Sequence, residues 1–82
     1  MNTFKTNVAK AFGAALREAR TRAKLSQEDL GLESGVDRTF VSMLERGVRQ
    51  PALSTVFALC DAMAIKPGQL VDRVALLRKR IG

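Results

Sequence analysis

Between residues 26 and 47, helix-capping residues alternate with glycines at intervals that leave room for two short helices. Ser26 is an N-cap residue followed by acidic residues in the first turn, where the helix dipole favours negative charge. Asp37 is a second N-cap residue. Gly35 and Gly47 can adopt the left-handed conformation that ends a helix. These four positions predict two helices of about two turns, over 27–34 and 38–46.

Two short helices that pack at a steep angle form a helix-turn-helix, and this geometry restricts the residue at defined positions. The fifth position of the first helix faces the second at close range and tolerates only a very small residue, and here it is Gly31. The turn position needs a residue that is comfortable at positive φ, and here it is Gly35. The inward positions must be apolar, and they are Leu30, Val36, Val41 and Leu44. Residues 27–46 are therefore predicted to form a helix-turn-helix.

Apolar residues at helical spacing predict three further helices. The first covers about 7–23, with an apolar face formed by Val8, Phe12, Leu16, Ala19 and Ala23. Another follows Pro51 and covers about 53–64, and the last begins at Pro67 and continues to the C-terminus. The chain shows no β-alternation and no internal repeat. We therefore expect an all-α fold of five helices in one domain, 1–82.

The charge of the chain indicates a polyanionic partner. The formal net charge is +6, and such a field attracts phosphates before any specific contact forms. The positive residues gather at the two ends, in 1–24 and 73–82, around a nearly neutral middle. Nucleic acid and an anionic membrane surface are the two candidate partners.

The residue types that are missing limit the chemistry. Cys60 is the only cysteine and histidine is absent, so a disulfide within the chain, a Cys/His metal cluster and a His-based triad cannot be built. We expect neither a metal nor another cofactor, and we do not expect an enzyme. The chain lacks an apolar run as long as a membrane span and a secretory signal, which predicts a cytoplasmic protein.

Residues 16–65 resemble the helix-turn-helix domain of the Cro and phage-repressor (XRE-like) family. Three segments carry the match, namely Leu25–Leu30, Gly35–Ser42 and Leu44–Gly47. The Asp-Arg-Thr sequence at 37–39, followed by an aromatic residue and a Val-Ser pair, is especially similar to the controller proteins of restriction-modification systems. The resemblance implies a homodimeric transcriptional regulator that reads a pseudo-palindromic operator in double-stranded DNA and catalyses no reaction.

The resemblance also implies which side chains meet DNA. The first turn of the second helix in the motif reaches base edges, and an arginine there can contact guanine through two hydrogen bonds. The candidates for base reading are Arg38, Thr39, Met43 and Arg49. The candidates for backbone contact are Ser26, Gln27, Phe40, Ser42 and Arg46. The alternative interpretation is a solvated helix surface, or core packing in the case of Phe40.

Two structural roles are predicted as well. In similar proteins the residues at the positions of Arg20 and Glu45 form a salt bridge between the first and third helices. The last helix, within about 67–82, has more apolar surface than a domain of this size can cover alone. Its candidate dimer residues are Leu70, Val74, Leu77 and Ile81.

The chain departs from the family pattern at three positions. Gly31 stands where the family usually has alanine, which costs roughly 1 kcal/mol of helix propensity. Ala52 stands where the family often has a serine cap for the fourth helix. Met43 stands where some relatives have a polar residue, so its only direct base contact would be with a thymine methyl.

Two other functions remain open from the residues. One is an antitoxin-type interaction protein that controls its own gene through the helix-turn-helix, for which about a dozen residues after Leu70 leave little room for a toxin-binding tail. The other is a membrane-surface binder that acts through the basic first helix. Binding to anionic vesicles without binding to duplex DNA would indicate the latter.

Overall fold

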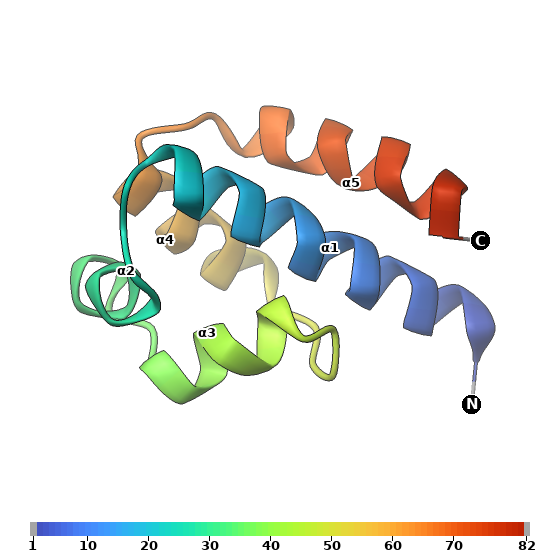
Figure 1. Cartoon of the computed structure of the whole chain (residues 1–82), viewed down its shortest axis with the longest axis horizontal. Coiled ribbons are helices and arrows are strands. Elements are labelled where there is room, and N and C mark those ends of the chain that lie inside the picture. The colour runs from blue at the N-terminus through green and yellow to red at the C-terminus, as the bar shows by residue number, and fades with distance from the viewer. Residues whose placement is uncertain (1, 82) are drawn as a thin grey trace.

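The computed structural model describes residues 2–81, which form five helices and no strand. The helices are α1 (Thr3–Arg22), α2 (Gln27–Ser34), α3 (Arg38–Glu45), α4 (Leu53–Met63) and α5 (Pro67–Ile81) (Figure 1). The prediction of an all-α fold with five helices is confirmed, and α2 has the predicted bounds.

The largest difference from the predicted helices is at the start of α1, which begins at Thr3 and not near residue 7. Asn2 explains the earlier start, because its side-chain oxygen accepts hydrogen bonds from the backbone N–H groups of Phe4, at 2.9 Å, and Lys5, at 3.4 Å. These bonds satisfy two of the free donors at the helix terminus. The helix therefore includes a polar turn that its apolar periodicity did not indicate.

The caps of the two central helices form as predicted. Ser26 Oγ accepts a hydrogen bond from the N–H of Asp29 at 2.9 Å, and Asp29 Oδ2 accepts one from the N–H of Ser26 at 3.1 Å. Asp37 Oδ1 accepts from the N–H of Thr39 at 2.7 Å. Gly35 and Gly47 have φ angles of 76° and 74°. Both glycines thus adopt the left-handed conformation that the sequence indicated.

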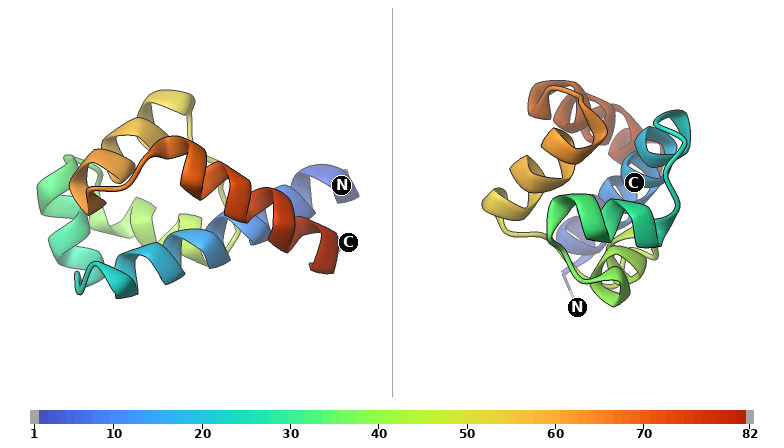
Figure 2. Two further views of the ribbon diagram at one scale, coloured as in Figure 1. Left: turned by 90° about the horizontal axis from the view of Figure 1, so that it is seen from above. Right: turned by 90° about the vertical axis from the view of Figure 1, so that its left-hand side faces the viewer.

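The long helix α1 lies between α3 on one side and α5 on the other. Figures 1 and 2 show α5 running antiparallel to α1, so that both ends of the chain lie at the same end of the molecule. Helix α2 packs against α3 and α4. The core lies where these helices meet, and its largest fully buried side chains are Leu16, Leu30, Leu44, Leu59, Val41 and Cys60.

The burial of α5 corrects the predicted dimer surface. Leu70 and Val74 are only 2% and 9% exposed and belong to the core of the chain itself. Leu77 is partly buried against the same core, and Ile81 is exposed. The apolar stripe of α5 faces α1, because a single chain of this size needs that stripe to complete its own core. Within residues 2–81, no helix is both long enough and apolar enough to cross a membrane.

Candidate nucleic-acid interface

Helices α2 and α3 approach each other so closely that Gly31 has no space for a side chain. A Cβ atom at Gly31 would lie 2.8 Å from the carbonyl oxygen of Val36 and 3.3 Å from the nitrogen of Arg38. The turn therefore passes directly over the backbone of α2, as the predicted helix-turn-helix requires. The inward residues Leu30, Val41 and Leu44 are fully buried, and Val36 packs against them.

The first half of α3 presents a polar surface beside the start of α2. Arg38 and Thr39 are exposed in the first turn, and Ser42 follows one turn later. These three residues and Gln27 line one shallow hollow, which we call the α3 hollow. The structure therefore brings together four of the nine residues that the sequence predicted to contact DNA.

The other predicted contact residues lie elsewhere on the motif. Phe40 packs against the core, which is the alternative that the sequence left open. Met43 is half-buried. Arg46 and Arg49 are exposed beyond the carboxyl end of α3, away from Arg38. The predicted DNA contacts thus form one group at the start of α3 and another beyond its end.

Ser26 and Gln27 both take part in interactions within the chain. The hydroxyl oxygen of Ser26 accepts the capping hydrogen bond, although the residue is exposed. The amide nitrogen of Gln27 donates to Glu45 Oε1 at 3.0 Å. An amide nitrogen carries two hydrogens, so one of them is used inside the protein. The contacts of these two residues with phosphate remain predictions.

Glu45 connects three helices through one buried carboxylate. Its side chain has no exposed surface and accepts hydrogen bonds from Arg20 Nε at 2.6 Å and Arg20 Nη2 at 3.0 Å. Gln27 from α2 and Arg17 from α1 donate to its Oε1, the latter at 3.4 Å. Arg20 Nη1 also donates to the carbonyl of Leu25 at 2.9 Å. The expected pair of Arg20 and Glu45 is present, and it fixes the end of α3 against α1.

The ionisation of Glu45 follows from these contacts. Burial raises the pKa of Glu45, but hydrogen bonds from Arg20, Gln27 and Arg17 lower it by more, so the pKa lies below its ordinary value. Burial opposes the charge of Arg20, but the hydrogen bond to Glu45 is the stronger effect and raises the pKa of Arg20. Both groups are therefore charged in the folded protein at neutral pH.

The sequence interpretation missed Gly13, which lets α1 lie directly on the end of α3. A Cβ atom at Gly13 would meet the carbonyl oxygen of Leu44 and would lie 2.6 Å from that of Glu45. A signal was present, because glycine in the middle of a helix costs about 1 kcal/mol relative to alanine and so indicates a close contact. The partners of Glu45 other than Arg20 had no comparable signal.

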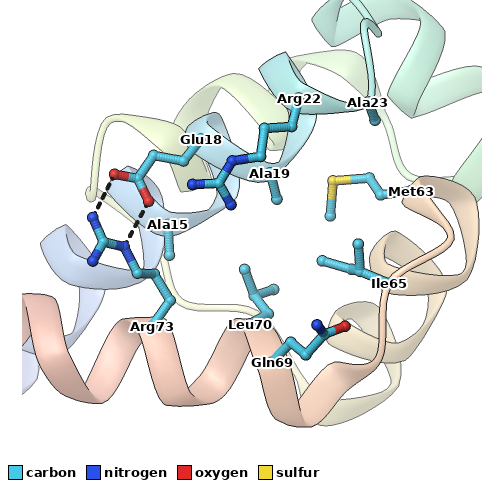
Figure 3. Close-up of a pocket in the computed structure, with 10 residues that line it drawn as sticks. All are labelled: Ala15, Glu18, Ala19, Arg22, Ala23, Met63, Ile65, Gln69, Leu70 and Arg73. Carbon is cyan, nitrogen blue, oxygen red and sulfur yellow. Dashed lines mark hydrogen bonds and ion pairs between the residues drawn. The ribbon is translucent and has the colours of Figure 1, made fainter.

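On the face of α1 that points away from α3, a small pocket separates α1 from α5 (Figure 3). Its floor is apolar, with Ala15, Ala19 and Leu70, and Figure 3 shows Glu18 and Arg73 joined across one side. Arg73 Nε and Nη2 donate to the two oxygens of Glu18 at 2.8 and 3.0 Å. The hydrogen bond from Arg73 lowers the pKa of Glu18. This pair holds α5 against α1.

Comparison with known proteins gives consistent matches. The family model described as "Helix-turn-helix" matches residues 16–70. The control protein C.BamHI of Bacillus amyloliquefaciens is 33% identical over 67 residues, covering 80% of this chain and 83% of that protein. The crystal structure of the restriction-modification controller protein C.AhdI from Aeromonas hydrophila is 44% identical, with a TM-score of 0.74 over 76% of this chain and 94% of that one. The clp gene regulator ClgR from Corynebacterium glutamicum is 25% identical, with a TM-score of 0.84 over 88% and 77% of the two chains.

Proposed function

This chain belongs to the helix-turn-helix family, whose model matches residues 16–70, and from this membership we propose that it is a sequence-specific DNA-binding transcriptional regulator. Its matches to a control protein and to a restriction-modification controller protein support the role of a controller. The observation that carries the proposal is the α3 hollow, where Arg38, Thr39 and Ser42 are presented together by a buttressed helix.

The proposed binding mode places α3 in the major groove. The guanidinium group of Arg38 donates two hydrogen bonds to O6 and N7 of a guanine, and Thr39 meets a neighbouring base edge. The residues at the start of α2 and beyond the end of α3 contact phosphates on either side of the groove. The phosphate contacts set the position of the helix, and the base contacts select the sequence.

We also propose that the regulator is a homodimer, because two copies of α3 are needed to read the two halves of a pseudo-palindromic site. The dimer surface is moved to exposed apolar residues of α4 and α5, which contact each other in the chain. Leu53 and Phe57 are four residues apart on one face of α4 and are 71% and 51% exposed. Val71 of α5 is 51% exposed. A second copy that covers these side chains removes them from water.

Selection of binding sites from a random duplex library tests this function. We expect enrichment of a pseudo-palindrome whose half-sites are spaced by about one helical turn, roughly 34–36 Å. Footprinting on the source genome then tests the controller role, for which we expect a site beside the promoter of the protein's own gene. Equal and weak binding to all duplexes would contradict the proposal. The family relatives favour this function over the antitoxin-type and membrane-surface alternatives.

A further inference from the structure

A second hollow lies beyond the carboxyl end of α3, between the first half of α1 and the loop that leads to α4. Four of the residues that line it are positively charged, namely Lys5, Lys10, Arg46 and Arg49. The other polar residues in its lining are Asn2, Thr6 and Gln50, and no acidic residue contributes to it. We call this surface the basic hollow.

Contacts between the loop and α1 hold the two walls of the basic hollow in place. Gln50 Nε2 donates a hydrogen bond to the carbonyl oxygen of Lys5 at 3.2 Å. A Cβ atom at Gly47 would lie 3.0 Å from the Cα of Lys10, so the loop backbone rests directly on α1. At the far end of α1, the guanidinium carbon of Arg78 lies 5.5 Å from the centre of the Phe4 ring. The first turns of α1 are therefore fixed to both α5 and the loop.

The four charges of the basic hollow are not neutralised by the part of the chain that the structure describes. All four residues are exposed, and the ion pairs found within 2–81 involve other side chains. Arg49 donates only to the neighbouring carbonyl of Val48, at 3.2 Å. Like charges held side by side repel one another, and a bound anion removes that repulsion.

The basic hollow extends the surface of the helix-turn-helix into a region that precedes the family match. That match begins at residue 16, whereas Lys5 and Lys10 lie in the earlier turns of α1. Figure 1 shows these turns projecting past the carboxyl end of α3. An anion bound here would lie next to DNA that occupies α3, on the side away from Arg38.

We propose that the basic hollow binds the phosphodiester backbone of DNA that flanks the segment read by α3, with Lys5 and Lys10 supplying phosphate contacts beside Arg46 and Arg49. This inference rests on the proposed function, because it needs α3 to be bound to duplex DNA. The contacts add affinity without adding base preference, since phosphates carry no sequence information. They also make affinity depend on the length of DNA beyond the recognised bases.

The test compares two double variants that remove the same charge. Lys5→Gln with Lys10→Gln removes two charges from the basic hollow, and Lys66→Gln with Lys79→Gln removes two from exposed positions outside its lining. Glutamine has a helix propensity close to that of lysine, and thermal unfolding followed by circular dichroism checks that each variant is folded. Dissociation constants are measured at several salt concentrations on the selected site, with long flanks and with the flanks trimmed.

We expect the Lys5/Lys10 variant to lose about 10- to 30-fold in affinity on the long duplex, and its salt slope to fall by about two units, because two phosphate contacts are lost. The loss should largely disappear on the trimmed duplex, and the preferred bases should be unchanged. The Lys66/Lys79 variant should keep the wild-type salt slope.

Three results would overturn the inference. Equal losses in the two double variants would show that only net charge matters. An unchanged salt slope in the Lys5/Lys10 variant would show that these lysines touch no phosphate. Loss of wild-type binding to vesicles of phosphatidylcholine and phosphatidylserine, with DNA binding intact, would assign the lysines to a membrane surface. Failure of the wild-type protein to bind any duplex is a separate result, and it would overturn the proposed function together with the inference.

Discussion

Arg20 and Glu45 form a two-point ion pair, with distances of 2.6 and 3.0 Å, in which the carboxylate is completely buried. The pair connects α1 to the last residue of α3, and Gln27 adds α2 to the same carboxylate. A buried charge is tolerated only when its partners replace the water that it has lost. The orientation of α3 therefore depends on side chains that do not face DNA.

A double-mutant cycle on Arg20 and Glu45 should show strong coupling. Arg20→Ala leaves the buried carboxylate with weaker partners and should lower the free energy of unfolding by about 3–5 kcal/mol. Glu45→Ala should cost less, because the partly exposed Arg20 can turn toward water. The double variant should lose less than the sum of the two. Urea unfolding measures all four proteins, and additive losses would remove the pair from the stability argument.

The protein should lose stability in acid partly through Glu45. Its hydrogen bonds hold the pKa of Glu45 below the ordinary value of 4.5, so the unfolded chain takes up a proton first as the pH falls. The stabilisation is complete above about pH 4.5 and is lost as the pH falls through the folded-state pKa. Glu45→Gln should therefore be less stable at neutral pH but show a shallower decline between pH 5 and 3. Thermal unfolding across this range checks it, and parallel curves would contradict it.

Arg38 and Arg46 should separate base reading from phosphate contact, because each alanine variant removes one exposed positive charge from α3 or its cap. Arg38→Ala should cost about 1–3 kcal/mol on the selected site and flatten the preference at one base pair in each half-site. Arg46→Ala should weaken binding to selected and random duplexes alike, and it should lower the salt slope by about one unit. If Arg38→Ala keeps every base preference, another residue reads the site, with Thr39 or Arg49 next in order.

Gly13 and Gly68 should respond in opposite directions to the same substitution. Gly13→Ala places a methyl group against the backbone carbonyls of Leu44 and Glu45, and it should lower the free energy of unfolding by about 1–3 kcal/mol. Gly68 lies in the first turn of α5, and a Cβ atom there has no neighbour within 4 Å. Gly68→Ala should stabilise the protein by up to about 1 kcal/mol. Denaturant midpoints decide between these outcomes, and a neutral Gly13→Ala would show that α1 and α3 can separate.

Phe57→Asp should dissociate the proposed dimer. An unpaired carboxylate at the interface adds its desolvation to the loss of the aromatic contact. We expect dimerisation to weaken by at least about 100-fold, which corresponds to roughly 3 kcal/mol. Leu32→Asp, on the exposed surface of α2, is the matched control and should leave the dimer intact. Sedimentation velocity at micromolar concentration measures both variants, and a dimeric Phe57→Asp protein would place the interface elsewhere.

Local signals in the sequence predicted the helix-turn-helix well. The caps at Ser26 and Asp37, the positive φ of Gly35 and the close approach at Gly31 each depend on a few neighbouring residues, and all four are present in the structure. The same holds for Ala52, at which α4 begins without a side-chain cap. The early start of α1 escaped prediction because a single Asn2 side chain decides it.

Features that depend on which surfaces meet were harder to predict. The apolar stripe of α5 was visible, but periodicity does not say whether a stripe faces its own chain or a second copy, and the structure places Leu70 and Val74 in the core of the chain. The basic hollow joins residues that are about 40 positions apart. Neither the net charge nor the helical spacing indicated that Lys5 and Lys10 would lie beside Arg46 and Arg49.

The position of Glu45 at the last residue of α3 also bears on how the specificity of such a protein can change. The clamp acts on the carboxyl end of the helix, whereas Arg38, Thr39 and Ser42 lie toward the amino end. Substitutions at these three positions leave the contacts of Glu45 with Arg20 and Gln27 in place. A new operator preference can therefore arise by exchanging a few exposed side chains on a helix whose pose is already set. Duplicated copies of such a gene could diverge toward separate targets while their folds stay the same.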